Sequence, residues 1–155
     1  MDKTITIHYQ EYGSVEELTA DDAALMRKAM EAAGGAYAPY SHFHVGAALR
    51  LDDGSVVVGN NQENAAYPSG LCAERTALFA ASAQRPDCRR YRALAIVGHD
   101  GDGYCEASPC GACRQVMSEY ERQQDFPMRV LCYLQGGGVR AFSGVADLLP
   151  FGFIF

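Results

Sequence analysis

The sequence contains no tryptophan, no apolar run long enough to cross a membrane, and no cluster of basic residues. A spanning helix needs about 20 apolar residues, so we expect no membrane partner. A formal net charge of −6, with 13 Lys and Arg against 19 Asp and Glu, disfavours nucleic acid as a partner, because such binding relies on positive charge. The N-terminus lacks the pattern of a secretory signal. We therefore expect a cytoplasmic protein.

The length and composition are those of one globular domain. A chain of 155 residues can bury about two-thirds of its unfolded surface. Apolar residues make up 48% and charged residues 21% of the chain, which is ordinary for such a domain. Six cysteines without a secretory signal favour a reducing compartment, where thiols bind metal or stay free.

Three of the cysteines lie in two short motifs, CAER at 72–75 and PCGAC at 109–113. Each motif lies where a helix is predicted to begin. Cys110 and Cys113 are three residues apart, so they share one face of a first helical turn and can bind one ion. A catalytic zinc site has three protein ligands and a water, and helix N-termini favour thiolates. With Cys72, these thiols predict a zinc site with an open position.

Two charged residues follow the first ligand. Glu74 is a candidate base that takes a proton from the water at the zinc. Three thiolates outweigh the charge of Zn²⁺, and Arg75 would offset part of that excess by donating to a thiolate. Alternatives remain for each residue, because a CxxC pair can be a redox couple or half of a structural zinc site. The other thiols, interpreted as non-ligands, are Cys88, Cys105 and Cys132.

The joint pattern CxE…PCxxC is close to the zinc-deaminase signature. With further motifs, it makes the chain resemble the small, tetrameric class of cytidine deaminase in which all three zinc ligands are cysteines. The resemblance runs from about residue 37 to residue 153. It rests on four motifs in order: YAPYSHFHVGAAL at 37–49, NQENAAYPSGLCAERTALF at 61–79, PCGACRQVMSEY at 109–120 and LLPFGF at 148–153.

The resemblance implies an enzyme of pyrimidine salvage, a zinc-dependent hydrolase. Its reaction converts cytidine and deoxycytidine to uridine and deoxyuridine plus ammonia. The partners implied are a small nucleoside and three further copies of the chain, with one Zn²⁺ per subunit of the homotetramer. The implied fold is a three-layer α/β/α sandwich with a mixed sheet of about five strands. Residues 1–17 are then an N-terminal extension, and residues 18–155 form the deaminase domain.

Several nucleoside contacts are implied in the same way. Asn61 and Glu63 follow a predicted strand, where ligands of open α/β sheets bind, and their side chains suit sugar hydroxyls. By resemblance, these two residues hold the ribose 3′-hydroxyl and Phe43 lines the pyrimidine pocket. The Ala73 N–H contacts the 2-oxo group of the base. Phe153 reaches the pocket of a neighbouring subunit, with Phe151 as the alternative in case of a register error.

Periodicity places the main elements. Residues 18–33 predict an amphipathic helix that opens with Thr19 and Asp22 and ends at Gly34. Residues 4–9 alternate like a strand, and two alternatives stay open for this N-terminal segment: an arm that lies on a neighbouring subunit, or a frayed tail. Strands are expected at 43–51, 56–58, 94–97, 130–134 and 139–142, with helices from 72 and 110 and a short one at 146–149.

Two classes of alternative stay open. Sister deaminases that act on blasticidin share CxE and PCxxC, and deaminases of free bases or nucleotides use related sites. The polar pair at 61 and 63 favours a substrate that contains ribose. A structural zinc module or a CxxC redox protein is the alternative outside the deaminases, but it leaves Cys72 and Glu74 unexplained.

Overall fold

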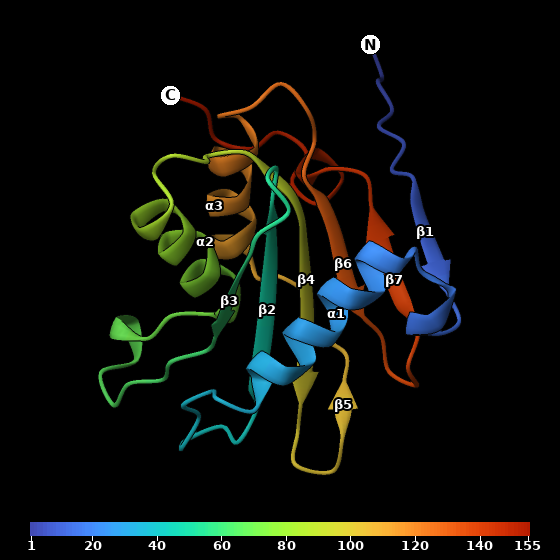
Figure 1. The fold of residues 1–155 in the computed structure, drawn as a ribbon. Helices are drawn as coiled ribbons and strands as arrows, with labels where there is room; N and C mark the ends of the chain where they lie inside the picture. The colour runs from blue at the N-terminus through green and yellow to red at the C-terminus, as the bar shows by residue number, and fades with distance from the viewer.

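Residues 1–155 are all described by a computed structural model, in which one mixed β-sheet lies between two layers of helix (Figure 1). The strands are β1 (Tyr9–Tyr12), β2 (His44–Leu51), β3 (Val56–Asn60), β4 (Tyr91–His99), β5 (Tyr104–Cys105), β6 (Arg129–Tyr133) and β7 (Val139–Phe142). The helices are α1 (Ala20–Ala33), α2 (Ala73–Gln84) and α3 (Gly111–Glu121), and the short 3-10 helices are η1 (Val15–Glu17), η2 (Tyr67–Ser69) and η3 (Val145–Asp147). The predicted three-layer α/β/α sandwich is confirmed.

The sheet has seven strands in the order β1-β7-β6-β4-β2-β3, with β5 paired to β4. β4 and β6 are parallel and all other pairs are antiparallel. The prediction of about five strands was therefore too low. Both missed strands are short: β1 begins where the alternating pattern of residues 4–9 ends, and β5 lies in a polar, glycine-containing stretch. Cys105, interpreted from the sequence as a non-ligand, lies in β5 and is buried.

Two hydrophobic cores cover the two faces of the sheet. Alternate residues of β2 divide between them, with Ala47 and Leu49 in the core under α2 and α3 and Ala48 in the core under α1. β4 divides in the same way between Leu94 and Ala95. Strands that are covered on both faces have continuous apolar sequences, which is why the central strands were predictable.

The N-terminal segment and α1 join the same body. Thr19 caps α1 by accepting a hydrogen bond from the Asp22 N–H at 3.3 Å, as expected of a helix start. Residues 9–12, within the segment predicted to be an extension, add β1 to the edge of the sheet beside β7. No helix is long and apolar enough to span a membrane.

The chain ends in an exposed apolar tail. The short helix expected at 146–149 is η3, a single 3-10 turn that begins one residue earlier. Beyond it, Phe151 is 92% and Phe153 is 72% exposed. The aromatic side chains of the tail are therefore exposed on the isolated chain and do not pack into its core.

Candidate metal centre and active site

Three thiols converge at the N-terminal ends of α2 and α3. The Sγ atoms of Cys72, Cys110 and Cys113 all lie within 4.8 Å of one another, and those of Cys72 and Cys110 are 3.8 Å apart. Tetrahedral zinc with Zn–S bonds of about 2.3 Å requires S···S distances of about 3.8 Å. The cluster therefore fits one Zn²⁺ held by three thiolates, which leaves one tetrahedral position for a water.

The local structure explains why these thiols meet. Cys72 and Cys110 are the N-cap residues of α2 and α3, and neither side chain caps its own helix. Cys113 lies in the first turn of α3 and is fully buried. Both helix N-termini therefore direct the positive ends of their dipoles toward the cluster, which favours thiolates over thiols.

Arg75 adds a positive charge to the cluster. Its Nη2 atom donates to the Cys72 Sγ at 3.5 Å, and its buried Nε has no partner within the chain. Hydrogen bonding with the Cys113 thiol, assisted by Arg75, lowers the pKa of Cys72, whereas the same contact and burial raise the pKa of Cys113. A divalent ion bound by the three sulfurs would favour the ionised form of each thiol.

Glu74 lies beside the cluster and is almost completely buried, with 3% of its surface exposed. Burial is the main cause that raises its pKa from 4.5 to about 7, and the charge of Cys72 adds to the effect. Hydrogen bonds from the Glu74 backbone N–H and the Cys113 thiol, and the charge of Arg75, only partly offset the shift. A carboxyl group with a pKa near neutrality can both accept and donate a proton, which is the property required of a general acid–base.

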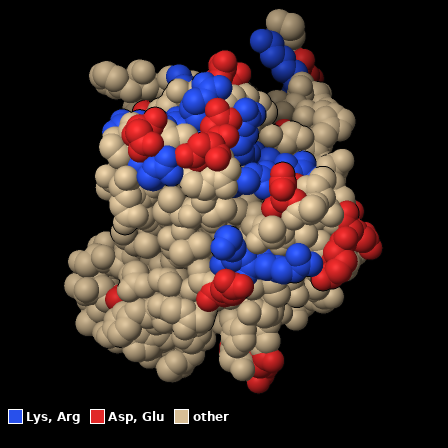
Figure 2. Space-filling model, viewed as in Figure 1, with Lys and Arg blue, Asp and Glu red and all other residues tan.

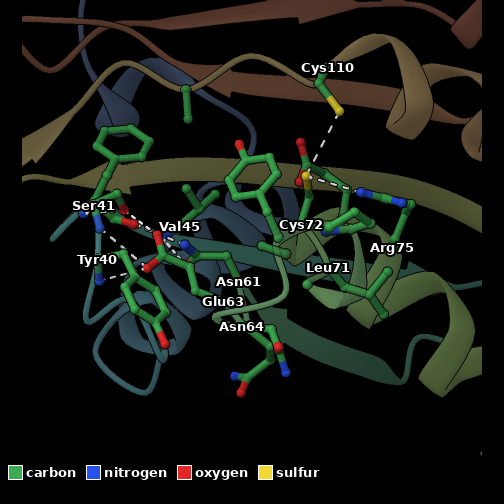
Figure 3. Close-up of a pocket in the computed structure, with 18 of the residues that line it drawn as sticks. Tyr40, Ser41, Val45, Asn61, Glu63, Asn64, Leu71, Cys72, Arg75 and Cys110 are labelled. Atoms are coloured by element: carbon green, nitrogen blue, oxygen red, sulfur yellow. Dashed lines mark hydrogen bonds between the residues drawn. The ribbon is translucent and has the colours of Figure 1, made fainter.

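A cavity of about 1050 Å³ opens in front of these residues. Figure 3 shows Cys72, Arg75 and Cys110 at one end of it and Tyr40, Ser41 and Glu63 at the other. Apolar side chains such as Val45 and Leu71 line the cavity together with polar ones, a mixture that suits a planar ring with polar substituents. The wall residues that the sequence had predicted as site residues are Phe43, Asn61, Glu63, Cys72, Ala73, Glu74, Arg75 and Cys110.

Asn61 and Glu63 also hold one wall of the cavity in place. The Asn61 Oδ1 accepts a hydrogen bond from the Val45 N–H at 2.7 Å, and its Nδ2 donates to the Phe43 carbonyl at 2.9 Å. Glu63 accepts hydrogen bonds from the N–H groups of Tyr40 and Ser41, at 2.9 and 3.3 Å. These two side chains therefore fix the segment that leads into β2.

Ser41 is a cavity residue that the sequence analysis missed. Its hydroxyl donates to the second oxygen of Glu63 and accepts from the Phe43 N–H at 3.0 Å. The bond from Ser41 is the main cause that lowers the pKa of Glu63, so this carboxylate is ionised at neutral pH. The only sequence signal was the position of Ser41 inside the motif at 37–49. Glu106, which also lines the cavity, had no such signal.

Among the residues predicted to contact the nucleoside, Phe153 alone does not line the cavity of its own chain. Its carbonyl accepts a hydrogen bond from Gln115 of α3 at 3.2 Å, which holds the tail beside that helix. Its ring remains largely exposed. A role for Phe153 at a cavity would therefore require a second copy of the chain.

Comparison with known proteins identifies relatives across most of the chain. Residues 19–126 match the family described as the cytidine and deoxycytidylate deaminase zinc-binding region. A cytidine deaminase of Halalkalibacterium halodurans is 50% identical over 99 residues, which are 64% of this chain and 71% of that protein. One from Mycobacterium tuberculosis is 44% identical over 108 residues, 68% of this chain and 77% of that protein.

Solved structures agree with this result. A crystal structure of cytidine deaminase from Burkholderia pseudomallei superposes with a TM-score of 0.73 at 45% identity, covering 84% of this chain and 97% of that one. The cytidine deaminase structure from Mycobacterium tuberculosis gives a TM-score of 0.68 at 36% identity, covering 85% and 96%. The family match spans the whole three-thiol cluster and the residues between its parts. This chain belongs to the cytidine and deoxycytidylate deaminase family.

Proposed function

We propose that this protein catalyses the zinc-dependent hydrolytic deamination of cytidine and deoxycytidine in pyrimidine salvage. The products are uridine or deoxyuridine and ammonia. One observation carries the proposal: Glu74, a buried carboxyl group with a pKa near 7, lies beside three converging thiols and lines the cavity. Perturbed ionisable groups of this kind, when they face a cavity, mark sites of chemistry.

Cys72, Cys110 and Cys113 would hold the metal, and Arg75 would draw charge from the Cys72 sulfur. When bound, Zn²⁺ acts as a Lewis acid that lowers the pKa of a water in the open position. The Arg75 Nε, which has no partner in the chain, is available to a second thiolate. These residues therefore hold the cluster together and limit its negative charge.

Glu74 moves the protons of the proposed reaction. Its carboxylate accepts a proton from the attacking water, whose oxygen bonds to C4 of the base, and delivers this proton to ring N3. In the second half of the reaction, Glu74 accepts the remaining proton from the new C4 hydroxyl and transfers it to the exocyclic amine. The C4–N4 bond then breaks, the C4 carbonyl forms and ammonia leaves. A pKa near 7 keeps both protonation states of Glu74 accessible at neutral pH, as this alternation requires.

The remaining contacts orient the nucleoside. We propose that Phe43 forms the wall beside the pyrimidine ring and that the Ala73 N–H contacts the 2-oxo group. We assign the ribose 3′-hydroxyl to Asn61 and Glu63. For Phe43, Ala73 and Asn61, the support is their position in the cavity wall. For Glu63, the ionised state adds support, because a carboxylate is a strong acceptor for a hydroxyl. A contact confined to the 3′-hydroxyl does not distinguish ribose from deoxyribose, so both nucleosides are proposed substrates.

We further propose a homotetramer in the cytoplasm, in which Phe153 enters the cavity of a neighbouring subunit. The exposed aromatic tail supports this assembly, because large exposed apolar patches mark interaction surfaces. Figure 2 shows a broad surface with few charges at the lower left, over the β3–α2 connection. This connection includes η2, where Tyr67 is 90% exposed. A reducing compartment is also needed to keep three thiols available for a metal.

The ultraviolet absorbance of cytidine tests the function directly. We expect purified zinc-loaded protein to convert cytidine and deoxycytidine, but not cytidine monophosphate, because the cavity presents carboxylates and only one arginine. Conversion of the monophosphate as well would overturn the proposed nucleoside specificity. No conversion of either, in protein shown to contain one zinc per chain, would favour the sister deaminases that act on blasticidin.

A further inference from the structure

We propose that Gly98 is a positioning residue that sets where the Phe43 ring lies in the cavity wall, and so controls the affinity for the pyrimidine ring. The inference rests on the proposed function, because it takes the cavity to be the nucleoside site. Gly98 itself does not line the cavity. It acts only through Phe43, which does.

The Phe43 ring occupies the space that a side chain at position 98 would need. A Cβ atom built on Gly98 would lie 2.7 Å from the Cζ and 3.1 Å from the Cε2 of Phe43. The Cys105 Sγ would lie 3.0 Å away on another side. Approaches under 3.0 Å do not occur between real Cβ atoms and their neighbours, so the ring can take its present position only over a glycine.

The register of the sheet explains why these groups meet. Gly98 of β4 pairs with Val45 of β2 on one side and with Cys105 of β5 on the other. Directly paired residues project to the same face of a sheet, and so do residues two apart in one strand. Val45 lines the cavity, so the empty position at Gly98 lies on that same face. Phe43, two residues before Val45, covers this position with its ring.

The atoms close to Gly98 belong to side chains, whereas two other glycines, Gly46 and Gly59, lie against the backbone of a helix. A Cβ atom on Gly46 would collide with the backbone of α1 at Ala29, and one on Gly59 with the backbone of α2 at Ala77. Those two glycines allow helices to approach the sheet, and neither helix can yield locally. At Gly98 the obstacle is the far end of a side chain, which can rotate. Substitution at Gly98 should therefore displace the wall without unfolding the protein.

A displaced ring changes substrate binding more than chemistry. Phe43 is about one-third exposed and borders the cavity, so its free space lies on the cavity side. A ring moved from its preferred rotamer costs about 0.5–1.5 kcal/mol, which the nucleoside must overcome if it needs the original wall. We expect Gly98→Ala to raise the KM for cytidine roughly two- to tenfold. The kcat should change by less, because Glu74 and the thiols are not touched.

The matched control is Gly103→Ala in the same β4–β5 hairpin. A Cβ atom there meets nothing within 4 Å, and Gly103 needs no positive φ. Both variants would be compared for zinc content, melting temperature, KM and kcat, and for uridine affinity by calorimetry, which needs no turnover. The expected result is a weaker affinity for uridine and a higher KM in Gly98→Ala only. Equal values in the two variants would overturn the inference.

A double variant separates the ring from a general loss of fold. Phe43→Leu shortens the side chain and removes the obstacle at position 98. Gly98→Ala would be introduced into the wild-type protein and into the Phe43→Leu variant, and the relative increase in KM compared. We expect the increase in the Phe43→Leu background to be less than half of that in the wild-type background. An undiminished increase would show that Gly98 acts independently of Phe43 and would overturn the inference. A wild-type protein that does not deaminate cytidine at all would instead overturn the proposed function, whatever the variants bind.

Discussion

Two carboxylates are buried in this protein, and their surroundings are opposite. Asp22, at the start of α1, has 4% of its surface exposed and Glu74, at the start of α2, has 3%. Asp22 forms ion pairs with two arginines that reach it from strands: Arg50 of β2 at 3.1 Å and Arg129 of β6 at 2.9 Å. Glu74 takes part in none of the ion pairs of the chain.

The difference separates a structural charge from the one that we propose to be reactive. The ion pairs of Asp22 join α1 to two strands. The Arg129 Nη2 also donates a hydrogen bond to the Tyr12 hydroxyl at 3.3 Å, so the cluster contacts β1 as well. Glu74 instead faces the cavity, and burial raises its pKa to about 7. A buried charge without a partner costs stability, and a protein keeps one where chemistry needs it. Burial alone would not have distinguished the two residues.

The largest effect predicted is the loss of turnover in Glu74→Gln. The amide keeps the size of the side chain but cannot accept a proton at this position, so kcat should fall by about 10²–10⁴-fold or more. Zinc content per chain and the circular dichroism spectrum should stay unchanged, because the three thiols are intact. Cytidine turnover and metal analysis of the same preparation provide the measurement. Activity within tenfold of the wild type would contradict the proton-transfer role.

Asp22→Asn is the matched substitution at the paired carboxylate. It leaves Arg50 and Arg129 without their shared partner, and breaking a buried pair typically destabilises a protein by about 3–5 kcal/mol. Urea denaturation of the zinc-loaded protein measures this loss, whereas kcat of the folded fraction should stay near the wild-type value. Asp52→Asn, which breaks more exposed pairs with Arg90 and Arg92, serves as control and should lower the stability much less, because solvent screens exposed pairs.

Most of the fold could be predicted because its central strands and its helices carry strong local patterns. β4 and β6 are continuous apolar runs, and α1 has both a cap and an apolar stripe. β1 and β5 were missed because they are four and two residues long and owe their conformation to the strands they pair with. Local sequence gives little information on such pairing, since the partners are distant in the chain.

The site divides in the same way. Cys72, Glu74 and Cys110 could be proposed from spacing, because helix N-termini place residues with fixed local geometry. The contact between Ser41 and Glu63 joins segments 22 residues apart and could not be found from spacing. The burial that raises the pKa of Glu74 is likewise a tertiary property. The sequence therefore indicated the candidate groups, and the fold determines their protonation and their hydrogen-bond partners.

The smallest predicted effect is the pH dependence of stability that Glu74 causes in zinc-free protein. Its pKa is about 7 when folded and 4.5 ordinarily, so the folded state binds the extra proton between these values. The contribution of Glu74 to the free energy of unfolding is therefore largest below pH 4.5. It decreases by up to about 3 kcal/mol as the pH rises toward and past 7. Glu74→Gln removes this titration but keeps the thiols. The free energy of unfolding, measured in urea after zinc removal by a chelator, should therefore favour Glu74→Gln increasingly from pH 5 to pH 8. A constant difference would mean that Glu74 is ionised in the folded chain and would remove the contrast with Asp22.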